Sequence, residues 1–151
     1  MQLFWSIASD RLRGHAIIRI VKVLDWQPVV SLLSEVIKSG QQRKGGRTPY
    51  NAMNMFRALL LARWYGLSYK QLEDALLVRL DFLVFCGFDP LGKLPDASTL
   101  NRFALRLDAM ELEASPFDLV QRQMDVKGIE LRPVVGALKH PKVRFRDKII
   151  W

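Results

Sequence analysis

The chain has 151 residues, half of them hydrophobic, so it is long and apolar enough for one folded domain with a real core, which argues against disorder. Its net charge of +8 favours a polyanionic partner, nucleic acid or an anionic membrane surface. The single cysteine, Cys86, excludes an intrachain disulfide and a thiolate metal site, and its apolar surroundings indicate a core residue. No apolar run reaches the ~20 residues that span a bilayer, so we expect a cytoplasmic protein without a membrane segment.

Residues 1–24 mix apolar and basic side chains and predict a partly ordered lead-in that docks on the domain. From Asp25 the apolar residues repeat at helical spacing until Gly40. Residues 41–48 follow with no periodicity and carry three cations, Arg43, Lys44 and Arg47. This loop is either a solvated connection or a basic arm that reaches along DNA phosphates or into a minor groove, and we weigh the two equally.

Two helices and a short third are predicted between residues 51 and 87. The first, residues 51–65, is apolar on nearly all sides and should be the central strut, stopped by Gly66. The second begins at Ser68, which with Gln71 has the spacing of a capping box. Asp81 begins a further short apolar helix that ends at Gly87, and turn residues follow up to Pro95.

The segment 98–107 predicts a helix with two unlike faces. An apolar stripe at helical spacing suits a core and is formed by Leu100, Phe103, Ala104 and Leu107. The residues off that stripe suit base edges and phosphates of DNA and are Ser98, Thr99, Asn101, Arg102 and Arg106. Any solvated helix carries such residues, and the two interpretations have similar weight alone. Together with the helix at Ser68 they favour a helix-turn-helix, elaborated by the insertion between its two helices.

A last helix is predicted from Ser115 to Val126, with Gly128 as its stop. After it the chain is basic, and the pairs Val134-Val135 and Ile149-Ile150 suit short strands. We therefore expect an all-α fold: a compact helical domain over residues 1–128, and a short irregular basic tail over residues 129–151.

No residue pattern predicts catalysis. His15 and His140 are far apart in sequence and stand in no metal-binding or triad-like motif, so we interpret both as surface or phosphate-contacting residues. Glu73 and Asp74 are adjacent on a helix and diverge by about 100°, which indicates a solvated face. The sequence predicts no catalytic residue, no metal ligand and no cofactor in this chain.

An ordered set of motifs between residues 11 and 128 suggests a family. It includes the segments 13–20, 24–26, 46–50, 55–65, 66–73, 79–82, 85–87 and 94–103. In these the chain resembles the N-terminal domain of bacterial insertion-sequence transposases of the acidic-triad type, specifically the group named after insertion sequence five. The resemblance implies a domain that binds double-stranded DNA at the terminal inverted repeats of the element and supports dimer formation.

The resemblance also implies a following RNase H-like domain, in which three carboxylates hold two divalent metals, expected to be Mg²⁺, for strand cleavage and joining. In the family an apolar strand with an aspartate follows the last helix, whereas Gly136 stands at the corresponding place here. We therefore expect a chain that lacks the acidic triad, looks truncated before the catalytic domain, and is catalytically incompetent alone.

Three functions remain open at this stage. The chain is a DNA-binding fragment that recognises element ends, or it acts within an active transposase with a catalytic partner in trans. The third hypothesis is an inhibitor or accessory subunit that pairs with full-length transposase, or with a second copy as a homodimer, through its apolar helices.

Overall fold

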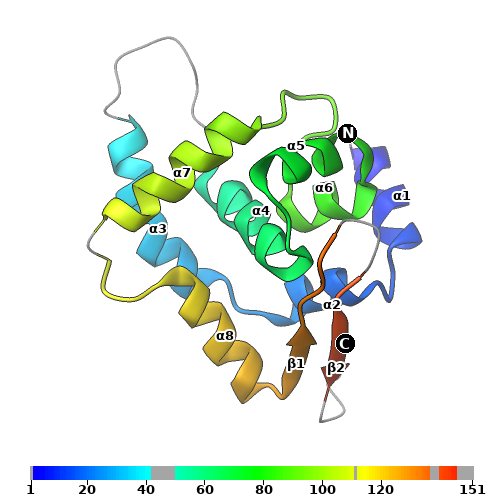
Figure 1. Cartoon of the computed structure of the whole chain (residues 1–151). Helices are drawn as coiled ribbons and strands as arrows, with labels where there is room; N and C mark the ends of the chain where they lie inside the picture. The colour runs from blue at the N-terminus through cyan, green and yellow to red at the C-terminus, as the bar shows by residue number, and fades with distance from the viewer. Residues whose placement is uncertain (1, 42–49, 111, 137–139, 146–151) are drawn as a thin grey trace.

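The computed structural model describes residues 2–41, 50–110, 112–136 and 140–145. These segments are mostly helical and carry one small antiparallel sheet (Figure 1), which confirms the predicted all-α class. The helices are α1 (Gln2–Arg11), α2 (Ala16–Val23), α3 (Gln27–Gln41), α4 (Ala52–Tyr65), α5 (Tyr69–Val78), α6 (Leu80–Cys86), α7 (Ala97–Ala109) and α8 (Pro116–Val126). The strands are β1 (Ile129–Arg132) and β2 (Lys142–Phe145).

Helix α4 is the centre of the fold, as its composition predicts. A helix that is apolar on all sides has no face for water, and most of the residues of α4 are buried. Asn51 begins the helix by accepting hydrogen bonds from the amides of Met53 and Asn54, and Gly66 ends it in the left-handed conformation at φ 60°. Helices α3, α5, α6 and α7 all contact α4, which therefore lies at the centre of these four helices.

The N-terminal segment is more ordered than its mixed composition predicts. It forms α1 and α2, and both helices contact α6. The side chains of Ile17, Ile18 and Ile20 are almost completely buried in the main core, which confirms the predicted docking. The lead-in is therefore part of the domain, because α2 has a continuous apolar face that only the core can cover.

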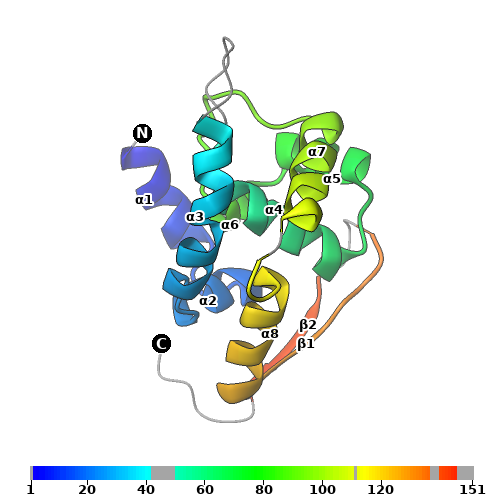
Figure 2. The ribbon, with the colours of Figure 1, turned by 90° about the vertical axis from the view of Figure 1, so that its left-hand side faces the viewer.

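Helices α5 and α7 pack against each other, while α6 lies beside α1 and α2 (Figure 1). The view turned by 90° places α3 on one flank of α4, with α5 and α7 on the other (Figure 2). The predicted stripe of α7 is buried at Leu100, Phe103 and Leu107, and Ala104 is half-buried. The other helices contribute large buried side chains to the same core, among them Phe56, Leu60, Trp64, Leu72 and Leu76. Cys86 is also fully buried, as expected.

The C-terminal segment is tied to the end of α4. Strands β1 and β2 pair antiparallel, with Arg132 opposite Lys142, and Ile129 enters the core. The backbone then turns along α4, where the amide of Val134 donates to the carbonyl of Trp64 at 3.0 Å and that of Gly136 to Tyr65 at 2.7 Å. These bonds satisfy carbonyls that the end of a helix leaves without a partner.

The positions of the two strands correct one prediction. Val134 and Val135 were expected in a strand, but they follow β1 and run along α4 instead, because the Val134 amide serves the helix end. Ile149 and Ile150 lie outside the described residues. The division of the chain at residue 128 into a helical domain and a basic tail stays a prediction. In the described segments no helix combines the length and apolarity needed to cross a membrane.

Candidate nucleic-acid interface

The helix pair α5 and α7 is built by local signals that the sequence contains. Ser68 accepts a hydrogen bond from the amide of Gln71, whose side chain accepts one from the Ser68 amide, so the predicted capping box is present. Helix α5 ends at Val78, and Arg79 adopts an extended backbone before α6 begins. Two helices that contact each other are thus separated along the chain by α6 and a turn, as the sequence predicts.

The first turn of α7 is held by two carboxylates. Asp96 accepts a hydrogen bond from the amide of Thr99 at 2.7 Å. Glu73, from α5, accepts one from the amide of Ala97 at 3.0 Å and also pairs with Lys70. Two of the amides that would otherwise attract a phosphate at this helix N-terminus are therefore already bound to anions. Glu73 also joins α5 to α7 directly.

This role of Glu73 corrects the interpretation of Glu73 and Asp74 as one solvated face. Asp74 is exposed, but only 19% of the Glu73 side chain is accessible, because it reaches across to α7. The hydrogen bond from Lys70 and then that from the Ala97 amide lower the pKa of Glu73. Similarly, the bonds that Thr99 donates lower the pKa of Asp96.

The exposed face of α7 carries four side chains in a row. Ser98, Asn101, Arg102 and Leu105 are all exposed, Leu105 by 58%. Ser98 precedes Asn101 and Arg102 by three and four residues, and Leu105 follows them by four and three, which places the four side chains on one face of the helix. The opposite face is fixed in the core by Leu100, Phe103 and Leu107. The row is therefore presented to solvent by a helix that cannot easily rotate.

The other two predicted residues of α7 lie at the edge of this row. Thr99 and Arg106 are half-buried. The Thr99 hydroxyl accepts a hydrogen bond from Arg102 at 3.4 Å, and the Arg106 guanidinium lies over the ring of Phe103 at 5.7 Å. Arg43, Lys44 and Arg47 lie outside the described residues, so the basic arm stays a prediction.

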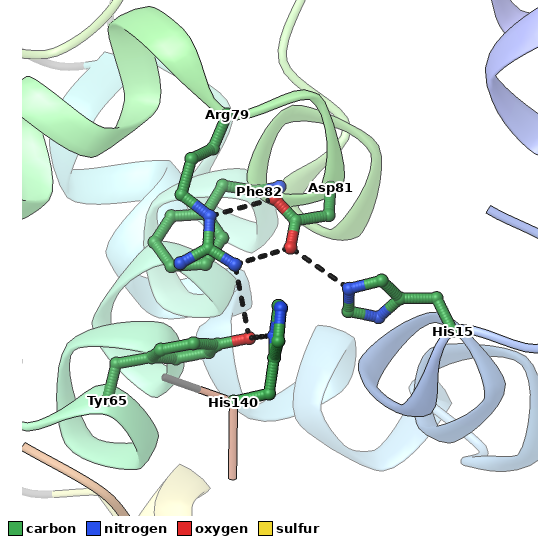
Figure 3. A network of polar contacts seen from close by, with 6 residues as sticks. All are labelled: His15, Tyr65, Arg79, Asp81, Phe82 and His140. Carbon is green, nitrogen blue, oxygen red and sulfur yellow. Dashed lines mark hydrogen bonds and ion pairs between the residues drawn. The ribbon is translucent and has the colours of Figure 1, made fainter. Parts of the chain in front are cut away.

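A second group of polar side chains was not foreseen from the sequence, and we call it the His15–Asp81 cluster. It consists of His15, Tyr65, Arg79, Asp81 and His140, which come from four separate stretches of the chain (Figure 3). Arg79 donates to both oxygens of Asp81, from Nε at 3.0 Å and from a terminal nitrogen at 2.6 Å. His15 Nε2 lies 3.0 Å from Asp81 Oδ2, and Tyr65 Oη lies 3.0 Å from His140 Nδ1.

Electrostatics holds this cluster together. Asp81 is the only charged residue among the buried ones in the described segments, and it is 8% exposed. Burial alone raises the pKa of its carboxyl, but the hydrogen bonds from His15 and Arg79 reverse the shift and hold that pKa well below its usual value. Burial raises the pKa of Tyr65 to about 12, and burial followed by the charge of His15 lowers the pKa of His140.

The cluster corrects the interpretation of the two histidines. His15 and His140 are 125 positions apart (140 minus 15), yet their ring centroids lie 5.0 Å apart. Only 19% of the His15 side chain is accessible, so it is not a surface residue, whereas His140 is exposed. The sequence contained one signal of this cluster. Arg79 and Asp81 are oppositely charged and stand on either side of Leu80 within an apolar stretch.

The described residues thus form a helical domain with a row of exposed side chains on α7. Comparison with known families identifies it further. Residues 6–106 match the family described as Transposase domain (DUF772), and the chain belongs to that family. No solved structure matches the chain.

Proposed function

We propose that this protein binds double-stranded DNA in transposition and recognises the ends of an insertion element through the exposed row on α7. The observation that carries this proposal is the row itself: Ser98, Asn101, Arg102 and Leu105 share one exposed face of a helix whose other face is core. Family membership supports the transposition-related role, and the net charge of +8 supports a polyanionic partner.

The chemistry of the row suits the major groove. An arginine can donate two hydrogen bonds to guanine and an asparagine can bond adenine through two, while an apolar side chain can contact the thymine methyl group. Arg102, Asn101 and Leu105 supply these three kinds of contact. Because Asp96 and Glu73 make the start of α7 anionic, the duplex would lie over its second and third turns.

We further propose that the protein is of the insertion sequence five group and that residues 1–151 contain no acidic triad. The sequence motifs support the group, and Gly136 at the position of the expected aspartate supports the missing triad. Strand cleavage would then require carboxylates other than those of residues 1–151, with Mg²⁺ bound there. Incubation of the pure protein with supercoiled DNA and Mg²⁺ should produce no nicks, and nicking that copurifies with the chain would contradict this.

Specific binding can be tested without knowing the target. Selection from a random duplex library should enrich a motif with the wild-type protein. Arg102→Ala should then bind this motif roughly 5- to 150-fold more weakly, since a bidentate base contact is worth about 1 to 3 kcal/mol, while its affinity for random DNA changes little. Arg122→Ala, which removes an equal charge from the exposed face of α8, is the matched control. Equal losses on both DNAs for Arg102→Ala would leave α7 as a phosphate contact only.

The arm at residues 43–47 should contribute without specificity. Lys44→Ala should weaken binding to the selected motif and to random DNA alike. Removal of Arg43, Lys44 and Arg47 together should flatten the dependence of log affinity on log salt by about 0.9 for each phosphate that the variant no longer neutralises. An unchanged slope would show that the arm does not neutralise phosphates.

The alternative partner is another polypeptide, either a second copy of this chain or full-length transposase. Two large apolar side chains on α1 support it, because Leu3 is 73% and Ile7 44% exposed. Light scattering with size-exclusion chromatography should then show a dimer that Leu3→Glu with Ile7→Glu dissolves. A wild-type protein that is monomeric and binds no DNA would favour pairing with full-length transposase.

A further inference from the structure

We propose that the His15–Asp81 cluster is a binding site for one zinc ion, with His15, Asp81 and His140 as its protein ligands. One potential ligand atom from each of these residues lies within 4.8 Å of the other two. Two imidazoles and a carboxylate are a ligand set that suits Zn²⁺. The site differs in place and composition from the row on α7 and does not depend on the function proposed there.

The geometry requires only a small closure. Zinc binds nitrogen and oxygen at about 2.0 to 2.2 Å, which puts the ligand atoms of a tetrahedral site about 3.4 Å apart. His15 Nε2 and Asp81 Oδ2 are already 3.0 Å apart, so the adjustment falls on His140. His140 is exposed and belongs to the chain between the two strands, so a movement of about 1.4 Å, from 4.8 Å to about 3.4 Å, would not disturb the core.

The neighbours of the three ligands have defined roles. Arg79 holds the carboxylate of Asp81 in place through both oxygens, as hydrogen-bond donors around a metal commonly do for ligating carboxylates. Zinc would replace the proton that His15 Nε2 shares with Asp81. The hydroxyl of Tyr65 lies 3.0 Å from His140 Nδ1 and can orient that ring. Figure 3 shows these polar groups pointing toward one another.

The composition of the cluster also selects the metal. Mg²⁺ requires several oxygen ligands, whereas this cluster offers one carboxylate whose charge is already compensated by Arg79. A structural role follows from the position of the ligands. His15 directly precedes α2, Asp81 lies in the first turn of α6, and His140 lies just before β2, so the ion would join three distant segments.

Calorimetric titration tests the proposal on protein without a histidine tag, after treatment with a chelator. The wild-type protein should bind one Zn²⁺ per chain and should give the visible absorption of tetrahedral Co²⁺. Because zinc would bind only the folded protein, it should also raise the melting temperature. His140→Ala should lower the zinc affinity at least about tenfold and abolish that rise. Lys142→Ala, two residues further along the same segment, should change neither the zinc affinity nor the rise in melting temperature.

The chain contains only two histidines, so the ring protons provide a second readout. One equivalent of Zn²⁺ should shift the ring signals of both His15 and His140, whereas millimolar Mg²⁺ should shift neither. The Tyr65→Phe variant keeps the buried ring. It should still bind zinc, and zinc should still shift the ring signals of both histidines. Absence of stoichiometric binding to the wild-type protein would overturn the proposal, as would equal affinity in His140→Ala.

Discussion

The exposed row on α7 and the His15–Asp81 cluster are built in opposite ways. The row comes from one continuous helix, its members are exposed, and it is supported by the apolar face behind it and by the carboxylates at the first turn. The cluster takes its members from four distant stretches and surrounds a buried carboxylate with cationic and polar groups. A periodic pattern can therefore predict the first, whereas only the folded chain assembles the second.

The two regions also differ in what they contribute to stability. Polar groups in water lose little when they are replaced, since water satisfies them as well as the protein does. A buried charge that loses its partners keeps the full cost of its removal from water. We therefore expect substitutions in the row to affect binding, and substitutions in the cluster to affect the fold.

The largest effect should come from Asp81→Asn. It leaves the guanidinium of Arg79 and the ring of His15 without the carboxylate that both contact, and removal of one partner of a buried ion pair typically costs about 3 to 5 kcal/mol. Urea denaturation in the presence of a chelator measures this free energy of unfolding without any contribution from metal. Asp108→Asn, the same change at an exposed position of α7, should alter it by less than about 0.5 kcal/mol. A loss below about 1 kcal/mol at Asp81 would mean that water reaches the cluster.

The second largest effect separates the two faces of α7. Leu100 is fully buried and Leu105 is 58% exposed, so the same truncation can be compared on one helix. Leu100→Ala should lower the free energy of unfolding by about 2 to 5 kcal/mol, while Leu105→Ala should have little effect. Chemical denaturation of both variants gives the comparison. Similar losses at the two positions would show that the exposed face of α7 is covered in solution.

The smallest effect concerns the contact between α5 and α7. The folded pKa of Glu73 is lowered by Lys70 and by the Ala97 amide, so its ionised form stabilises the folded protein above its ordinary pKa of about 4.3. This stabilisation is lost as the pH falls toward the lower, folded value. Glu73→Gln should therefore be less stable than the wild-type protein at about pH 6, and the difference should shrink between about pH 4 and 3. A difference that persists unchanged at about pH 3 would contradict this.

Most of the fold was predictable because its signals are local. The capping box at Ser68, the stop at Gly66 and the apolar stripe of α7 each depend on residues within one or two turns. The helical lead-in was underestimated, because α1 and α2 are short segments whose order comes from packing on α6. The path of Val134 and Val135 was mispredicted, because hydrogen bonds to α4 replace the strand that their β-branched side chains favour.

In the candidate sites, too, local features were predictable from the sequence and contacts between distant segments were not. Helical spacing brings Ser98, Asn101 and Arg102 to one face, and the structure agrees. Spacing carries no information about Glu73, whose side chain leaves its own helix to reach the first turn of α7. Nor can it show that His140 meets His15, because their approach requires the segment after β1 to lie against α4. Sequence therefore predicted what a single helix presents and missed what two segments build together.

The bonds from Val134 and Gly136 to the end of α4 impose an order on folding during synthesis. The acceptor carbonyls at Trp64 and Tyr65 leave the ribosome long before their donors, since Val134 follows Trp64 by 134 minus 64, or 70, positions. At translation rates of about 5 to 20 residues per second, that delay is roughly 4 to 14 s. During this interval the carbonyls of Trp64 and Tyr65 lack these donors, and chaperones have time to bind the nascent chain.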